Sequence, residues 1–135
     1  MIIQPDSLSA RGLPVQRSFY SNQEPVVTHG SFELENSGRE PMMLSIGRVR
    51  LLGGSDIIPI DDFFLYLLPD YEEKDPALIE LLSLTTSQYE ISFPPISAVP
   101  YLIEDIEVEI MLEVAGETVQ VRSPYQISRR TPKRR

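Results

Sequence analysis

Residues 103–114 read Ile-Glu-Asp-Ile-Glu-Val-Glu-Ile-Met-Leu-Glu-Val, and this stretch decides the fold class. Apolar and mostly acidic residues alternate along it, which is the two-residue period of a β-strand with one buried face. The apolar positions are Ile106, Val108, Ile110, Leu112 and Val114, and the positions between them are Glu107, Glu109, Met111 and Glu113. We expect a strand whose apolar side packs on a second layer and whose glutamate side meets water or a partner.

A hairpin is predicted directly after this strand. With Gly116-Glu117 as its two-residue turn, Val114 lies opposite Val119, so that apolar residues meet on one face. The same register brings Arg122, opposite Met111, within reach of two carboxylates on the other face, those of Glu109 and Glu113.

Shorter alternating segments precede this hairpin. The alternation between Leu44 and Leu51 changes phase at Gly47-Arg48, which predicts a β-bulge there. Residues 57–68 are mostly apolar and are typical of a strand covered on both faces. Pro94-Pro95 is expected to stop the strand at residues 89–93, because proline cannot donate to a central ladder.

One short helix is expected near residues 75–84. Asp75 can accept hydrogen bonds from the first free amides of a helix, and Pro76 suits the first helical position. Leu78, Leu81 and Leu82 would then share one helix face. We interpret this segment as a cap over an open end of the sheets.

Roughly seven short strands with regularly spaced turn signals indicate an all-β fold, an antiparallel β-sandwich with this one helix. The segment Ser31–Gly38, Ser-Phe-Glu-Leu-Glu-Asn-Ser-Gly, resembles the phrase F-x-L-x-N-x-G of immunoglobulin-like accessory domains. The resemblance implies an immunoglobulin-like sandwich and carries over no functional residue. We expect an N-terminal arm at residues 1–13, a sandwich domain at 14–128 and a basic tail at 129–135.

Composition excludes several classes of function. The 135 residues include no cysteine, no tryptophan and one histidine, so disulfide scaffolds, thiolate metal sites and cysteine nucleophiles are impossible. No apolar run approaches the roughly 20 residues of a membrane helix, and residues 1–10 lack the pattern of a secretory signal. We therefore expect a soluble protein without a membrane partner, in the cytoplasm or within a larger particle.

The charge distribution suggests a mode of association. Five of the 12 basic residues fall in the last seven positions, which leaves residues 1–128 with a net charge of −13. Such a body repels phosphate, so a nucleic-acid partner is not expected. The basic tail fits an acidic patch on a neighbouring copy or another protein. The residues expected to bind a partner are Glu107, Glu109, Glu113, Arg129, Arg130, Lys133, Arg134 and Arg135.

No residue pattern predicts catalysis or a cofactor. His29 has no nucleophile or orienting carboxylate at a known spacing, and Gly53-Gly54-Ser55 lacks the lysine and helix of a phosphate-binding loop. We therefore interpret the chain as a non-enzymatic β-sandwich that works as an interaction or assembly module, with a protein partner or as a homo-oligomer.

Two other classes of function stay open. A small accessory domain would bind Ca²⁺ through the acidic loop at Asp70–Asp75, or carbohydrate through exposed tyrosines. The tyrosines considered are Tyr66, Tyr71, Tyr89, Tyr101 and Tyr125. A carboxylate hydrolase would need a cleft that holds two carboxylates about 5–10 Å apart.

Overall fold

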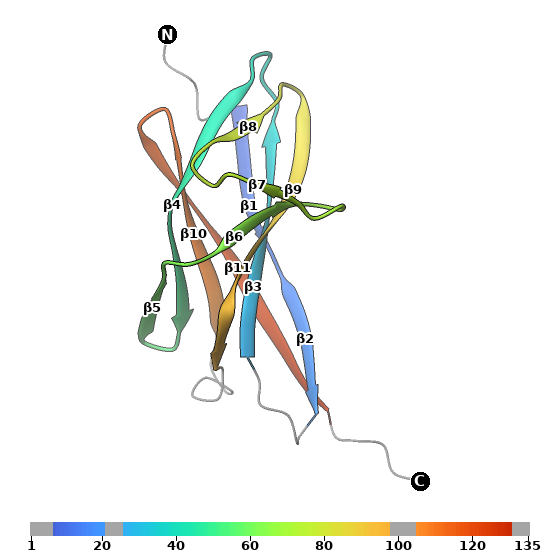
Figure 1. The fold of residues 1–135 in the computed structure, drawn as a ribbon, viewed down its shortest axis with the longest axis vertical. Coiled ribbons are helices and arrows are strands. Elements are labelled where there is room, and N and C mark those ends of the chain that lie inside the picture. Colours follow the sequence, from blue (N-terminus) through green and yellow to red (C-terminus); the bar gives the residue numbers. More distant parts are fainter. Residues whose placement is uncertain (1–6, 21–25, 98–104, 131–135) are drawn as a thin grey trace.

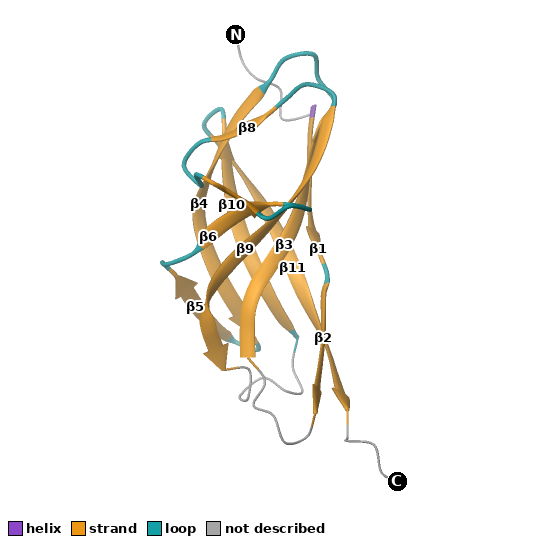
Figure 2. Cartoon of the chain, turned by 45° about the vertical axis from the view of Figure 1, so that its right-hand side comes forward, coloured by secondary structure: helices purple, strands orange, loops and turns teal. Residues whose placement is uncertain are grey.

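The computed structural model describes residues 7–20, 26–97 and 105–130, and strands make up nearly all of their regular structure (Figure 2). The strands are β1 (Leu8–Leu13), β2 (Val15–Tyr20), β3 (Val26–Asn36), β4 (Met42–Gly53), β5 (Asp56–Ile60), β6 (Phe64–Leu67), β7 (Glu72–Lys74), β8 (Ile79–Leu81), β9 (Thr85–Ser97), β10 (Ile106–Val114) and β11 (Glu117–Arg130). In these described parts, no helix has the length and apolar character needed to cross a bilayer.

The strands form two sheets that pack face to face in an elongated sandwich (Figure 1). The first sheet has the order β1-β3-β9-β6-β7, and the second has the order β2-β11-β10-β4-β5 with β8 paired to β4. All pairings are antiparallel except β2 with β11. The expected fold class, an immunoglobulin-like antiparallel β-sandwich, is confirmed.

The core follows from the alternation along the central strands. In β10 the side chains of Ile106, Val108, Ile110, Leu112 and Val114 are buried and face the first sheet. Phe32 and Tyr89 of the first sheet stack with ring centroids 5.3 Å apart and close the core from the other side. Burial of these apolar surfaces is the main stabilising term, because the chain has no disulfide.

The β10–β11 hairpin has a different turn from the one expected. Ala115 and Gly116 have φ angles of 52° and 80°, so they form the turn, and Val114 pairs with Glu117 rather than with Val119. Positive φ at both central residues is the geometry of a type I′ turn. The predicted register is therefore wrong by two residues. Because two is the period of a strand, the buried face is unchanged.

The predicted bulge at Gly47-Arg48 is confirmed. Met111 of β10 pairs with Arg48 and the next residue, Leu112, pairs with Ile46, so Gly47 is the extra residue of β4. The bulge restores the inward orientation of the apolar residues on both sides of it.

Residues 57–68 do not form a single strand. β5 belongs to the second sheet and β6 to the first, and the chain crosses between them at residues 61–63. The exposed pair Asp61-Asp62 marks this crossing, since two carboxylates cannot continue a strand covered on both faces. The prediction of one doubly covered strand was wrong for this reason.

The helix expected near residues 75–84 is also wrong. Asp75 Oδ1 accepts a hydrogen bond from the Ala77 amide at 2.9 Å, as a capping residue would, but only one turn follows. Ile79 and Leu81 then alternate into the core as strand β8, which pairs with Met42–Leu44 of β4. Burial with a period of two therefore overrides the local helix signal.

Most of the segment expected as an N-terminal arm belongs to the sandwich. β1 pairs with β3 at the edge of the first sheet, and after Pro14 the chain enters β2, which pairs with β11 of the second. At Gly12 the chain lies so close to β11 that a methyl group there would overlap the backbone carbonyl of Arg122. β11 also runs to Arg130, two residues beyond the expected boundary of the sandwich.

Polar side chains hold the ends of the strands. Asn36 is fully buried: its amide donates to the carbonyls of Glu40 and Leu81, and its oxygen accepts from the Gly38 amide. This explains the structural role of the N-x-G part of the Ser31–Gly38 phrase.

β9 resumes pairing with β3 at Ile96, so Pro94-Pro95 interrupts the ladder and does not end the strand as had been expected.

Candidate interaction surfaces

The outer face of the second sheet carries a buried ion pair at its centre. Glu109 lies opposite Arg50 of β4 and opposite Arg122 of β11, and its side chain is only 1% exposed. Arg50 Nε donates to Glu109 at 2.7 Å, Gln120 donates to the second carboxylate oxygen, and Arg122 lies 3.7 Å from that oxygen. Hydrogen bonds from Arg50 and Gln120, together with the nearby charge of Arg122, therefore compensate the buried carboxylate.

The expected acidic patch on β10 needs correction. Glu109 is covered by groups of its own chain and cannot reach a partner from this position. Glu107 is partly exposed and lies 3.6 Å from Arg122, while Glu113 is exposed. Of the three predicted glutamates, two therefore reach the surface, and their role in partner binding stays a prediction.

The predicted basic residues divide between strand and tail. Arg129 and Arg130 form the end of β11, where their backbone pairs with Phe19 and Tyr20 of β2. Lys133, Arg134 and Arg135 lie outside the described residues. Partner binding by this segment is likewise a prediction.

Large apolar side chains gather on the outside of β8. We call Met43, Leu78, Leu82 and Leu84 the β8 surface; their exposed fractions run from 43% at Met43 to 76% at Leu84. Ile79 and Leu81 point inward, so Leu78, Glu80 and Leu82 face outward, and one carboxylate lies between the two leucines. In the described part of the chain, β4 is the only strand that pairs with β8.

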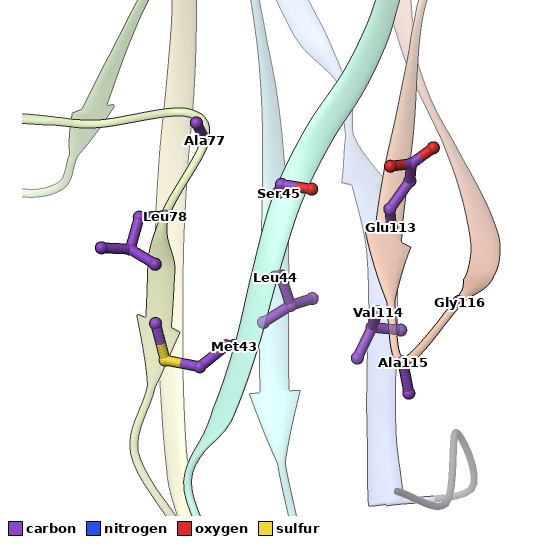
Figure 3. Close-up of a pocket in the computed structure, with 9 residues that line it drawn as sticks. All are labelled: Met43, Leu44, Ser45, Ala77, Leu78, Glu113, Val114, Ala115 and Gly116. Carbon is purple, nitrogen blue, oxygen red and sulfur yellow. The ribbon is translucent and has the colours of Figure 1, made fainter.

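Two hollows flank the β8 surface, and Leu78 lines both. The first, of about 400 Å³, lies between β8, β4 and the β10–β11 hairpin (Figure 3). In Figure 3 the Met43 side chain reaches from β4 towards β8, and Glu113 borders the hollow on the hairpin side. The second, of about 330 Å³, lies between β8, β7 and the start of β9, and includes Leu82. The β8 surface thus combines protruding leucines with adjacent depressions.

Leu84 has an unusual backbone conformation. Its φ angle is 56°, in the left-handed region that glycine and asparagine enter most readily. A bulky residue there costs about 1 kcal/mol, and burial does not offset the cost because the side chain is exposed. Folding alone therefore gives no reason for leucine at this position.

The sequence contained a signal for the β8 surface that the helix prediction obscured. A helical reading gathers Leu78, Leu81 and Leu82 on one buried face, whereas a strand of Ile79–Leu81 sends Leu78 and Leu82 outward. The available clue was Ile79, because a β-branched residue shortly after the turn signal Asp75-Pro76 favours a strand over a helix.

A second exposed cluster, of aromatic residues, lies on the outer face of the first sheet. The ring of Tyr66 is 6.4 Å from that of Phe64 and 6.3 Å from that of Tyr71. Phe64 and Tyr71 are more than half exposed. Across the sheet, Tyr66 pairs with Glu73 of β7 on one side and with Glu90 of β9 on the other. We call Phe64, Tyr66, Tyr71, Glu73 and Glu90 the aromatic patch.

The structure brings together two of the five tyrosines considered for carbohydrate binding. Tyr89 and Tyr125 are buried, and the Tyr125 hydroxyl bonds to the backbone of His29. Tyr101 lies outside the described residues. The Tyr66 and Tyr71 rings are inclined by 63°, so they do not form the flat platform on which a sugar ring stacks.

The acidic loop at residues 70–75 is partly strand. β7 occupies Glu72–Lys74, and Lys74 Nζ lies 2.8 Å from Glu72 Oε1. Asp75 uses one carboxylate oxygen on the Ala77 amide. Across the described residues, no three histidine, aspartate or glutamate side chains are grouped so that they could hold a metal ion.

One partly exposed carboxylate, that of Glu33, has a shifted pKa. Glu33 accepts hydrogen bonds from Arg11 Nε at 2.9 Å and from Gln88 Nε2 at 3.2 Å. The hydrogen bond from Arg11, then that from Gln88, holds the pKa of Glu33 below its ordinary value of 4.5. This row of residues on β1, β3 and β9 braces the outer face of the first sheet.

Comparison with known proteins adds the fold and no family. No protein-family model matches the chain, and no curated protein matches it. Among solved structures, it is similar to a family 123 glycoside hydrolase from Clostridium perfringens, with 7% identity, a TM-score of 0.50 and 93% of this chain covered. The chain spans only 28% of that hydrolase chain.

Two further similar structures are covered over almost their whole length. One is a PapD-like domain of human CEP192, with 16% identity, a TM-score of 0.42, and 98% of this chain and 92% of that chain covered. The other is the CooA pilin subunit from enterotoxigenic Escherichia coli, with 10% identity, a TM-score of 0.38, and 94% and 99% covered. At these identities the likeness concerns the fold alone.

Proposed function

We propose that this chain is a non-catalytic β-sandwich module, a structural component of a protein assembly, and that its copies associate through the β8 surface. The observation that carries the proposal is the exposure of Leu78, Leu82 and Leu84, of which Leu78 lines both hollows and Leu82 lines the second. Contiguous exposed apolar side chains on a soluble domain are typical of protein interfaces.

The backbone at Leu84 supports the same conclusion. A residue that is strained and exposed in the isolated chain becomes favourable once a partner buries it. Leucine side chains that enter the hollows of a second copy would bury apolar area on both molecules. Such a contact would be self-complementary, as in a two-fold interface.

The accessory domain for Ca²⁺ or carbohydrate is the second candidate, because Phe64 and Tyr71 are exposed, although Tyr66 and Tyr71 form no flat platform for a sugar ring. It predicts that saturating Ca²⁺ or a glycan raises the melting temperature, since a ligand that binds only the folded state stabilises it. The absence of a shift with either ligand would remove this candidate.

The experiment is a light-scattering series over protein concentration on the wild type and on Leu84→Asn. The wild-type mass should rise above the 15.3 kDa of one chain. Leu84→Asn should lower the association and leave the stability of the isolated chain unchanged or higher, because asparagine tolerates positive φ. A role in folding alone would predict the opposite change in stability.

Ile57→Asn is the matched control. Ile57 is also an exposed apolar residue, at 57%, but it lies on β5, away from both hollows. The Ile57→Asn variant should associate to the same extent as the wild type. A wild type that stays monomeric at all concentrations, or equal effects of the two substitutions, would contradict the proposal.

A further inference from the structure

We infer that the aromatic patch binds the basic C-terminal segment, residues 131–135, of a second copy of the chain. This inference rests on the proposed function and names a second contact of the same assembly. It places the contact on the first sheet, whereas β8 belongs to the second.

The chemistry of the patch suits a cation. Tyr66 lies between Glu73 and Glu90 in the cross-strand pairing, with Phe64 and Tyr71 beside it. Within the described residues, neither of these glutamates forms an ion pair. Ring faces attract guanidinium and ammonium groups, and adjacent carboxylates strengthen the attraction.

Tyr71 repeats the pattern seen at Leu84. Its φ angle is 56° and its side chain is 57% exposed. Asparagine or glycine would be cheaper at this backbone position, and the exposed ring contributes little to the core. The ring packs edge-on against Tyr66 on one side, and its exposed side is open to a ligand.

The charge distribution selects the occupant. Four of the described cations already contact carboxylates of their own chain: Arg11, Arg50, Lys74 and Arg122. The segment Thr-Pro-Lys-Arg-Arg at 131–135 holds three cations in five residues and follows directly on β11. On a body with a net charge of −13, this segment is the densest source of positive charge.

A tail from one copy and a patch on the next make a heterologous contact. After one such contact, the copy that gives its tail keeps a free patch and the copy that gives its patch keeps a free tail, so the contact repeats along a ring or a filament. The contact through the β8 surface is self-complementary, and the two contacts together would crosslink such chains.

The test uses two full-length forms of the chain mixed together. One form carries Thr131→Cys with a nitroxide label, which attaches at a single site because the chain has no other cysteine. The other form is ¹⁵N-labelled and carries no nitroxide. Any paramagnetic broadening in its spectrum must come from a neighbouring molecule. The expected result is broadening confined to the amides of residues 64–73 and 90.

Matched variants separate specific binding from general attraction. Tyr71→Asn in the ¹⁵N-labelled form should weaken the contact about 2- to 5-fold, the range for an exposed cation–π pair, without lowering stability. Glu117→Gln removes a carboxylate from the exposed β10–β11 hairpin and should leave the broadening unchanged. The broadening should decrease in 0.5 M salt, because the contact between the basic tail and the aromatic patch is exposed and salt screens its charges.

Two results would overturn the inference. They are absence of broadening, and broadening spread over all acidic surfaces of the ¹⁵N-labelled form. Leu84→Asn in both forms should leave broadening at the patch intact. Light scattering of Leu84→Asn thus reports failure of the β8 contact, whereas missing broadening at the aromatic patch reports failure of the tail contact.

Discussion

At the residue scale, the most consequential group is the Glu109 carboxylate. It is buried on the outer face of the second sheet and depends chiefly on Arg50, whose guanidinium is mostly covered. A buried charge that loses its main partner is strongly unfavourable. The arrangement therefore stabilises the junction of β4, β10 and β11 and leaves little acidic surface at their centre.

Arg50→Met is expected to lower the free energy of unfolding by about 2 kcal/mol, because it leaves the Glu109 carboxylate with weaker donors. Arg122→Met is the control: its side chain is half exposed and lies 3.7 Å from the same carboxylate. Its loss should stay below about 1 kcal/mol. Urea denaturation at pH 7 measures both, and equal losses would refute the assigned hierarchy.

The Glu33 row predicts a pH dependence. Because the pKa of Glu33 is lowered in the folded state, its hydrogen bond with Arg11 stabilises the fold above pH 4.5. This stabilisation is lost as the pH falls through the folded-state pKa of Glu33. Arg11→Met should therefore reduce stability at pH 6, and the difference from the wild type should vanish in acid. NMR titration of the Glu33 carboxyl carbon should show that the pKa of Glu33 in Arg11→Met is higher than in the wild type and closer to 4.5.

Arg39→Met serves as the control for that titration, since Arg39 is exposed in the turn between β3 and β4. It should leave the titration of Glu33 unchanged. A Glu33 carboxyl that titrates alike in the wild type and in Arg11→Met would show that the hydrogen bond does not persist in solution.

At the element scale, hydrophobic period predicted more than local capping signals did. The alternation of residues 106–114 and the phase change at Gly47 both follow from burial of one sheet face, and both are seen in the structure. The hairpin register depended on which two residues occupy a turn, and φ angles are not encoded in the alternation. Asp75-Pro76 begins a turn as readily as a helix, so it could not decide between them.

The switch of the N-terminal chain between sheets depends on Gly12. Gly12→Ala should lower the free energy of unfolding by about 3 kcal/mol, because the added methyl group would displace the backbone of β11 at Arg122. Gly47→Ala is a suitable comparison, since its new methyl group would meet only the flexible end of Glu113 at 3.1 Å. Gly47→Ala should lower the free energy of unfolding by less than about 1 kcal/mol, and thermal unfolding measures both variants. Similar losses for the two would contradict the close approach of β1 to β11.

At the scale of the whole molecule, the sequence predicted the overall charge distribution better than the place of the acidic surface. The acidic body and basic C-terminal segment are evident from the charges alone. The glutamates of β10 were expected to form the acidic surface, but arginines on the neighbouring strands β4 and β11 cover their centre. Which residues lie across a sheet depends on long-range register, and one sequence does not determine it.

The β8 surface was missed, and the aromatic patch was anticipated only in part, through Tyr66 and Tyr71. Phe64 and Tyr66 fell within a segment interpreted as buried on both faces, and Leu78 and Leu82 within a helix. Tyr71 and Leu84 are exposed and have positive φ angles, which a pattern of apolar residues does not reveal. For Phe64, Leu78 and Leu82, the tertiary arrangement exposed a residue that the local pattern placed inside.

The central claim, that copies meet at the β8 surface, is tested most directly by hydrogen–deuterium exchange at low and high protein concentration. We predict slower exchange of the amides of residues 78–84 at the high concentration, with no change in β5. Unchanged exchange at residues 78–84 under conditions where the mass exceeds that of one chain would contradict the claim, because the copies would then meet elsewhere.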